Sequence, residues 1–319
     1  MKKNKSMATL AREYIAHRQR LGYQMRVVGR RVLQFVEFAK KSKHKGHITT
    51  DLAVRWACQN QTSFPLHCAR RLQFVRCFAR YAAIFDAATE IPPVGLLGKS
   101  YYRIQPHIYS DDELRALMEE ARKLPPADCI RSRTYVALFG LLVCTGIRIT
   151  EAVRLKKSDV DLDRGLLKIV ESKNRKSRLV VLHPTACIQL RAYERLRDQY
   201  PSPPRDPEAF FLSERGKALN VSMADCTFWG ISHRLGWNAA GGHCNPRIYD
   251  IRHTFACRRL LQWYRDGVDI DHSIASLSTY MGHETLRDTY WYLNGIPELM
   301  QIAASRFELF AKHSQEVFS

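Results

Sequence analysis

Apolar residues recur at helical spacing in the first hundred residues. One run follows the i, i+3, i+4, i+7 pattern of an amphipathic helix: Val32, Phe35, Val36 and Ala39. A second run is aromatic and repeats at i, i+4, i+7, i+11: Phe74, Phe78, Tyr81 and Phe85. Arginines at positions 70, 71, 76 and 80 are interleaved with it. We interpret the aromatic run as part of a helix-bundle core, with the arginines on its outer side.

Proline and glycine end this helical pattern. The stretch Ile91-Pro92-Pro93-Val94-Gly95 cannot continue a helix. Basic residues, among them Lys99 and Arg103, follow it. We therefore predict a helical domain over residues 1–93 and a basic linker over residues 94–108.

A second domain is predicted over residues 109–319. It opens with Ser110-Asp-Asp-Glu113, a capping-box pattern placed before Leu114 and Leu117. Its pattern is mostly helical. Two β-branched runs, residues 166–170 and 178–182, enclose a polar basic turn and predict a hairpin. The predicted fold class is mainly α with a small β-hairpin or sheet, and the C-terminal domain is mixed α/β.

The longest apolar run, residues 136–144, is much shorter than the roughly 20 residues that a membrane-spanning helix needs. The first residues are basic and lead to Arg12 and Glu13, which is not the pattern of a signal peptide. We expect no membrane partner and a cytoplasmic protein.

Positive charge is concentrated at the N-terminal end. The 319 residues carry a formal net charge of +19, and residues 1–100, with 19 Lys and Arg against 5 Asp and Glu, carry +14 of it. Self-repulsion of this size favours a polyanionic partner, because Lys and Arg that neutralise phosphates supply most sequence-independent nucleic-acid affinity. Charge alone indicates a class of partner and no chemistry.

The nine cysteines are scattered along the chain and include no C-x-x-C pair. A structural zinc site or a disulfide framework needs clustered or paired spacing. We therefore expect free thiols, no metal and no cofactor.

Four patches of the second domain, taken in order, resemble the tyrosine recombinase (phage-integrase-like) family. They are Thr145-Gly-Ile-Arg148-Ile-Thr-Glu151, the hairpin turn with Lys173, Tyr249-Asp-Ile-Arg252-His253-Thr, and Met281-Gly-His283 followed nine residues later by Tyr292. The likeness spans residues 108 to 310, and the basic helical domain suits the core-binding domain of the family. Each patch alone is a weak signal, and the order of all four is a strong one.

These residue types suit phosphoryl transfer without a metal. Negative charge spreads over the non-bridging oxygens of a phosphodiester under attack, and a guanidinium binds such oxygens in pairs. We expect Arg148 and Arg252 to form this clamp, because each lies in an apolar stretch where a charged side chain needs a reason to be. The resemblance implies that His283 binds the scissile phosphate. Lys173 could protonate the leaving 5′-oxygen. Because Arg175, Lys176 and Arg178 lie close to it in the sequence, a plain phosphate contact is the alternative role for any of these residues.

The resemblance implies that Tyr292 is the nucleophile and forms a 3′-phosphotyrosyl link. Tyr290 is the competing candidate, and the nine-residue offset from His283 favours Tyr292. A phenol with a pKa near ~10 needs a base or cationic neighbours to attack at neutral pH.

One position departs from the family pattern. Tyr249 stands where the family usually has a histidine, three residues before Arg252. Tyrosine donates hydrogen bonds but is a weak proton acceptor, so the general-base role is in doubt. His243 and His253 are weaker candidates for it.

The last part of the chain predicts one more amphipathic helix after Pro297, with an apolar stripe from Leu299 to Phe310. Internal docking and exchange with a neighbouring protomer are equally compatible with this stripe. The segment from His283 to Phe307 is most similar to recombinases of transposable elements, including the kind encoded three in a row.

The predicted function is site-specific DNA recombination or integration, as in transposition of a mobile element. The partners would be double-stranded recombination sites, bound by a homo- or hetero-tetramer, with or without sister recombinases. Three alternatives remain: a type IB topoisomerase, a catalytically impaired DNA-binding regulator of the same fold, and a metal-dependent transposase or nuclease. The last needs clustered carboxylates, which this sequence does not display.

Overall fold

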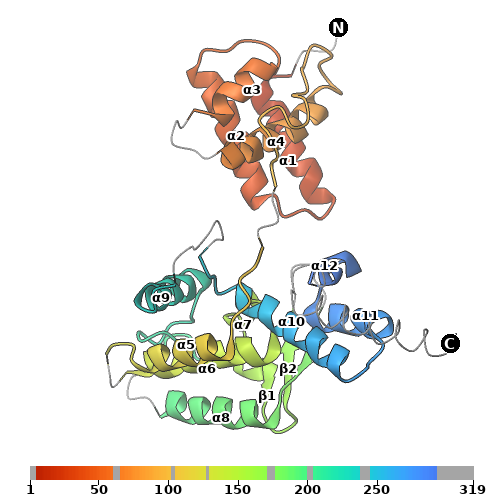
Figure 1. Cartoon of the computed structure of the whole chain (residues 1–319). Helices are drawn as coiled ribbons and strands as arrows, with labels where there is room; N and C mark the ends of the chain where they lie inside the picture. Colours follow the sequence, from red (N-terminus) through yellow and green to blue (C-terminus); the bar gives the residue numbers. More distant parts are fainter. Residues whose placement is uncertain are drawn as a thin grey trace, which may run out of the picture. The chain divides into compact units, whose positions relative to one another are not determined.

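The chain divides into two units, Met1–Arg103 and Ile104–Ser319. The described elements of the first unit are all helices. In the computed structural model the described residues are 5–59, 65–101, 105–126, 129–170, 177–199, 204–237 and 245–292. The described helices of the first unit are α1 (Met7–Arg20), α2 (Arg26–Lys41), α3 (Thr50–Ala57) and α4 (Pro65–Ala82) (Figure 1).

The core of the first unit confirms the predicted helix over residues 32–39. Val32, Phe35 and Ala39 of α2 are buried against aromatic and aliphatic residues of the other three helices. The aromatic run is only partly a core. Phe78 is fully buried, whereas Phe85 lies beyond the end of α4 and is 46% exposed.

The buried face of α4 is formed mostly by small and aliphatic residues and includes only one residue of the aromatic run. It consists of Ala69, Leu72, Val75, Phe78, Ala79 and Ala82. The aromatic run forms a stripe at the edge of this face, and its last member, Phe85, lies beyond Ala82, where α4 ends.

The interleaved arginines divide into two groups. Arg71 lies over the ring of Trp56, 4.3 Å from its centroid, and donates to the Trp56 carbonyl at 2.6 Å. Arg76 donates to the carbonyl of Pro92 at 2.8 Å, which ties the segment after α4 to that helix. Arg70 and Arg80 are exposed, as expected for the outer side.

The second unit is a mixed α/β structure. Its described elements are α5 (Asp111–Arg122), α6 (Ile130–Thr145), α7 (Ile149–Ala152), the 3₁₀ helix η1 (Lys157–Asp159), β1 (Val160–Asp161), β2 (Leu166–Ile169), β3 (Arg178–Val181), α8 (Pro184–Asp198), α9 (Val221–Arg234), α10 (Asp250–Arg265), α11 (Ile270–Met281) and α12 (Leu286–Tyr290). The fold class predicted from the sequence is confirmed.

The predicted hairpin is present as strands β2 and β3. They pair antiparallel, with Leu166 opposite Val181 and Ile169 opposite Arg178. The sequence pattern missed the two-residue strand β1, which pairs with β2 and completes a sheet of order β1-β2-β3. A strand of two residues is too short to show a period.

Helix α6 is the centre of the second unit, with α5, α8 and α10 packed around it (Figure 1). Buried residues lie on all sides of α6. This burial explains why residues 136–144 form a continuous apolar run. No helix in the described parts of the chain is long and apolar enough to cross a bilayer.

The helix start predicted at Ser110 is confirmed in detail. The Ser110 side chain accepts from the backbone N–H of Glu113, and the Glu113 carboxylate accepts from the backbone N–H of Ser110. Just before it, the backbone N–H of Tyr109 donates to Thr254 of α10. The entrance to this unit is thereby tied to the helix that carries Arg252.

Gly146 ends α6 in the left-handed region, at φ +61°. A Cβ built there would lie 2.5 Å from Cδ1 of Phe255 on α10. The close approach of α6 and α10 therefore needs glycine for two reasons, the backbone conformation and the missing side chain.

We expect Gly146→Ala to lower the free energy of unfolding of the second unit by about 2–5 kcal/mol, because left-handed backbone costs about 1–2 kcal/mol and overpacking about 1–3 kcal/mol. Gly267→Ala is the control, since Gly267 has φ +71° and a Cβ added there would meet nothing within 4 Å. Gly267→Ala should lose only the part of the free energy of unfolding that the left-handed backbone conformation accounts for. Urea unfolding measures both, and equal losses would contradict the steric argument.

Candidate active site

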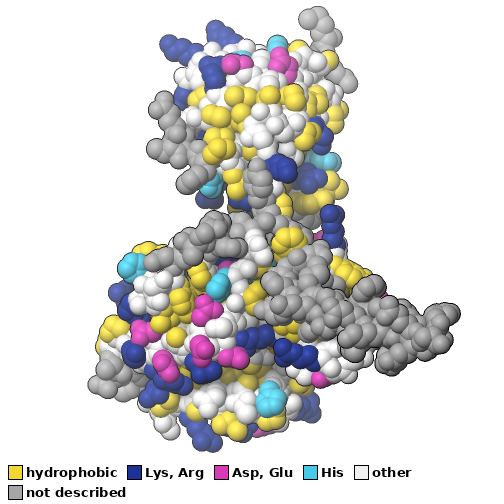
Figure 2. All heavy atoms as spheres, in the orientation of Figure 1, with side chains coloured by type: hydrophobic (Ala, Val, Ile, Leu, Met, Phe, Trp, Pro, Cys, Tyr) yellow, Lys and Arg dark blue, Asp and Glu magenta, His cyan; other side chains and the backbone are white. Residues whose placement is uncertain are grey.

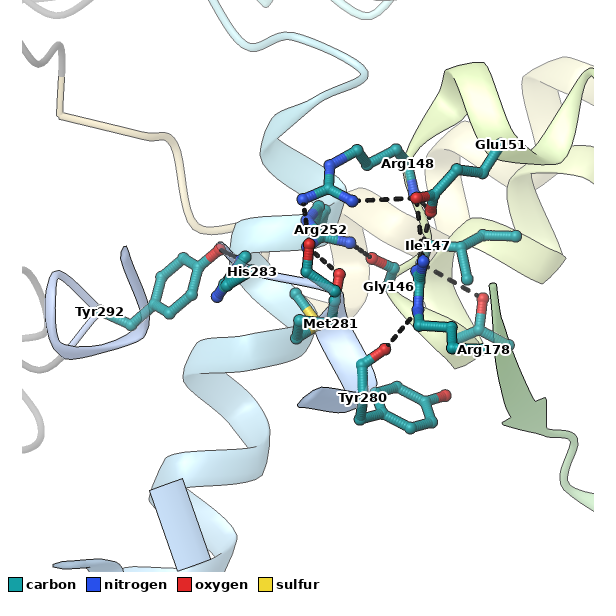
Figure 3. A network of polar contacts seen from close by, with 12 residues as sticks. Gly146, Ile147, Arg148, Glu151, Arg178, Arg252, Tyr280, Met281, His283 and Tyr292 are labelled. Carbon is teal, nitrogen blue, oxygen red and sulfur yellow. Dashed lines mark hydrogen bonds and ion pairs between the residues drawn. The ribbon is translucent and has the colours of Figure 1, made fainter. Parts of the chain in front are cut away.

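The carboxyl end of α11 is where the predicted site residues meet. Gly282 caps this helix at φ +67°, and His283 follows directly. Three consecutive carbonyls at this end each accept a hydrogen bond from a different arginine (Figure 3): Tyr280 from Arg178 at 2.8 Å, Met281 from Arg252 at 2.5 Å and Gly282 from Arg148 at 2.7 Å. Guanidinium groups suit this place, because the last carbonyls of a helix lack intrahelical partners and carry partial negative charge.

Arg148 lies at the start of α7, where the chain leaves the apolar helix α6. Its side chain is mostly buried, at 17% exposure, and one of its terminal nitrogens donates to Glu151 at 2.9 Å. The other donates to the carbonyl of Gly282. The first predicted arginine is therefore held by a carboxylate on one side and by the end of α11 on the other.

Glu151 is a buried carboxylate between two arginines. Its side chain accepts two hydrogen bonds from Arg178, at 3.0 and 2.8 Å, in addition to those from the backbone and side chain of Arg148. Burial raises its pKa, but the hydrogen bonds and charges of the two arginines outweigh burial and bring the pKa to about 2. Glu151 is thus ionised at every working pH.

Arg252 is buried within α10, with 2% of its surface exposed. Its terminal nitrogens donate to the carbonyls of Gly146 and Met281, which join the ends of α6 and α11. Its Nε makes no hydrogen bond to any described residue. Burial lowers the pKa of this arginine, and the nearby Tyr292 partly offsets that.

Tyr292 is buried and lies against apolar residues of α10 and α11. Its Oη is 3.4 Å from Nε2 of His283 (Figure 3). Burial raises the pKa of Tyr292 to about 12, although the charge of Arg252 acts in the opposite direction. Tyr290, the competing nucleophile, is 41% exposed on α12.

His283 is a neutral imidazole in this structure. Burial lowers its pKa to about 3, and the charges of Arg252 and Arg148 add to the effect. Its Nδ1 lies 2.7 Å from Oγ1 of the fully buried Thr289. One ring nitrogen therefore faces a hydroxyl from α12, while the other faces the phenol of Tyr292.

Tyr249 stands at the start of α10 and is 43% exposed. Its ring contacts His253 edge-on at 5.1 Å, and His253 contacts Tyr292 edge-on at 5.2 Å. The sequence offers His253 as one of two weaker candidates for the general base, and the structure places its ring beside the candidate nucleophile.

Two candidates lie outside the described residues, namely Lys173 in the hairpin turn and His243. The amphipathic stripe predicted from Leu299 to Phe310 also lies outside them. Four predicted site residues, Arg148, Arg252, His283 and Tyr292, come together at the end of α11, and Tyr249 joins them through the ring of His253.

Sequence reasoning missed the supporting residues of the site. Glu151 belongs to the first motif, but the sequence indicated no role for it. Arg178 was one of several basic residues at the hairpin turn, and nothing distinguished it from the others. Thr289 had no signal, because its contact with His283 depends on how α12 folds back. Within the described ranges, no group of three or more His, Cys, Asp or Glu side chains could hold a metal ion.

Residues 108–297 match the phage integrase family. This match covers more than half of the chain, and the chain therefore belongs to that family, the tyrosine recombinases, which are enzymes that break and rejoin DNA strands.

Two similar proteins agree with this membership, and one solved structure shares the fold. The protein y4rB of Sinorhizobium fredii, named as an integrase/recombinase, is 40% identical over 93% of this chain and 95% of its own. The tyrosine recombinase XerA of Thermococcus kodakarensis is 27% identical over 76% of this chain and 75% of its own. The integrase of transposon Tn1549, solved in complex with transposon right end DNA, shares the fold at a TM-score of 0.67 and 12% identity, over 96% of this chain and 100% of its own.

The folded site should make the protein sensitive to acid. The unfolded chain binds a proton on histidine near pH 6.5, whereas folded His283 has a pKa of about 3. The stability that this group contributes is therefore present above pH 6.5 and is lost as the pH falls toward 3. Glu151, with a pKa of about 2 against 4.5, adds a loss below pH 4.5.

We expect His283→Gln to flatten the dependence of the free energy of unfolding on pH between 6.5 and 4.5, as measured by urea unfolding at a series of pH values. His272→Gln is the control, because that side chain is 89% exposed on α11. If the two variants follow the same curve as the original protein, His283 does not carry this dependence.

Proposed function

We propose that this protein is a site-specific DNA recombinase, an integrase or transposase of a mobile element, which cuts and rejoins DNA through a 3′-phosphotyrosyl link to Tyr292. One observation carries the proposal. One buried and one mostly buried guanidinium, a neutral imidazole and a buried phenol, from segments far apart in the sequence, converge at the end of α11 (Figure 3).

The arginines would stabilise the charge that develops on the scissile phosphate. Arg148 and Arg252 are held in place by carbonyls before substrate arrives, so little reorganisation is needed when charge appears. The free Nε of Arg252 is a buried donor for a phosphate oxygen. A buried donor of this kind acts in a low-dielectric environment, where its effect is larger than in water.

Attack by Oη of Tyr292 forms the bond to phosphorus and breaks the bond from phosphorus to the 5′-oxygen. The phenolic proton passes to Nε2 of His283, 3.4 Å away. The pKa of this imidazole is about 3 without substrate, and the negative charge of a phosphate bound beside it would raise that pKa and make it a better acceptor. The leaving 5′-oxygen takes a proton from Lys173, the acid that the resemblance implies. The phosphodiester energy is kept in the tyrosyl link, so rejoining needs no ATP.

This assignment accounts for Tyr249 in the place of the usual histidine. Tyr249 is largely exposed and lies one ring away from Tyr292, so it is better placed to donate to a phosphate than to accept a proton. With His283 as the acceptor, the departure from the family pattern does not require loss of activity, and the catalytically impaired regulator is the less favoured alternative.

Duplex DNA is the proposed partner, bound by both units. Residues 1–100 carry +14 of the net charge of +19, and Lys and Arg side chains lie at the surface of the N-terminal unit (Figure 2). We propose that residues 1–93 are the core-binding domain, residues 94–108 the linker and residues 109–319 the catalytic domain. Assembly as a homo- or hetero-tetramer on recombination sites, with sister recombinases where these are encoded together, belongs to the same proposal, as does a cytoplasmic location on the nucleoid.

Tyr292→Phe should abolish covalent attachment to DNA, since phenylalanine lacks the attacking oxygen. The test incubates the protein in EDTA with nicked suicide substrates that tile the DNA ends of the element encoding it. A denaturing gel then detects the protein–DNA adduct. We expect an adduct with the original protein and none with Tyr292→Phe.

Tyr290→Phe is the matched control and should keep the adduct, because Tyr290 is exposed and two residues from the nucleophile. An adduct that persists in Tyr292→Phe and disappears in Tyr290→Phe would reverse the assignment. No adduct on any end of the element would favour the regulator, and relaxation of supercoiled DNA without recombination between two sites would favour a type IB topoisomerase.

A further inference from the structure

We propose that Arg178, on β3, is a positioning residue of the active site: it neutralises Glu151 and holds the end of α11, so that Arg148 and His283 are aligned for the phosphate. The inference rests on the proposed function, because it states how that site is kept in working geometry. Within the hairpin patch, the resemblance implies a catalytic role for Lys173 and none for Arg178.

Every nitrogen of the Arg178 guanidinium is engaged within the protein. Nε donates to the carbonyl of Tyr280 at 2.8 Å, and the two terminal nitrogens donate to the two oxygens of Glu151 at 3.0 and 2.8 Å. Only 10% of the side chain is exposed. A guanidinium engaged in this way supports its neighbours and is not the group that meets the substrate.

Glu151 links Arg178 to the first arginine of the clamp. Each of its oxygens accepts one hydrogen bond from Arg178 and one from Arg148, whose backbone N–H and terminal nitrogen both donate at 2.9 Å. The two arginines and the carboxylate together carry one net positive charge. Without Arg178 the remaining pair would be neutral, and Arg148 would offer the phosphate much less charge.

Contact with the turn before His283 provides the second link. A Cβ built on Gly282 would lie 2.8 Å from a terminal nitrogen of Arg178 and 3.0 Å from its Cζ. The guanidinium therefore packs flat against the residue that ends α11 and precedes His283. The strand β3 is thereby fixed to the segment that carries the imidazole.

The test compares single-turnover cleavage of two suicide substrates, one with a normal scissile phosphate and one with a methylphosphonate, which lacks a charged oxygen. We expect Arg178→Gln to slow cleavage of the normal substrate by about 10²-fold, as misplacement of catalytic groups by about 1 Å does. On the methylphosphonate the loss should be clearly smaller than on the normal substrate, because less positive charge is needed there and only the displacement of His283 still acts. Arg178→Lys should fall between, since an ammonium keeps the charge but cannot make all three contacts.

Arg197→Gln is the matched control. Arg197 is also a buried arginine, 1% exposed, and donates to a carboxylate and to the carbonyl of Phe210, but it lies on α8. A change there acts only through folding, so it should affect both substrates alike. If Arg178→Gln likewise slows both substrates by the same factor, its role is merely structural and the inference is overturned.

A double variant separates action through Glu151 from direct contact with the phosphate. If Arg178 acts through Glu151, adding Arg178→Gln to Glu151→Gln should slow cleavage by no more than a few fold further. Fully multiplicative losses would mean that Arg178 acts independently of Glu151, which also overturns the inference.

A DNA-free measurement keeps this inference separate from the proposed function. If the original protein forms no adduct on either substrate, the proposed function fails, and the ¹⁵N imidazole resonances of His283 still report on its alignment. We expect these resonances, assigned with His283→Gln, to shift in Arg178→Gln and to stay unchanged in Arg197→Gln. No shift in Arg178→Gln would overturn the positioning role whatever the enzymatic result.

Discussion

The carbonyl end of α11 is the constraint on which the site depends. A helix that ends in a buried place leaves its last carbonyls without intrahelical partners, and each must find a donor there. In this protein the donors for Tyr280, Met281 and Gly282 are three guanidiniums from β3, α10 and the start of α7. Because these carbonyls accept from arginines of three distant segments, positive charge is concentrated directly beside His283.

The same arrangement explains how several like charges are kept together. Three guanidiniums repel one another, and Glu151 is the carboxylate placed between two of them. Its pKa of about 2 means that it stays negative, while the pKa of His283, at about 3, means that the imidazole adds no further positive charge. The site is positive enough for a phosphate, and its histidine stays neutral while no phosphate is bound.

Glycine makes the close packing around this helix end possible. Gly146 ends α6 against the ring of Phe255, and Gly282 ends α11 against the guanidinium of Arg178. Both residues have positive φ, and both offer their carbonyls to an arginine. The two glycines therefore allow the arginines to approach the helix ends. A side chain at Gly146 would displace α10, which carries Arg252, and a side chain at Gly282 would displace Arg178.

The sequence by itself determined the elements with a clear local signal: the helix over residues 32–39, the cap at Ser110, the hairpin around residues 166–182 and, through ordered motifs, the residues Arg148, Arg252, His283 and Tyr292. Only the tertiary structure decided which neighbours support them. Thr289 has no periodicity or motif of its own, and the patches that contain Arg178 and His253 do not show their contacts, which join segments through space. The exposure of Phe85 has the same origin, because helical spacing describes a face but does not show where the helix ends or what packs against it.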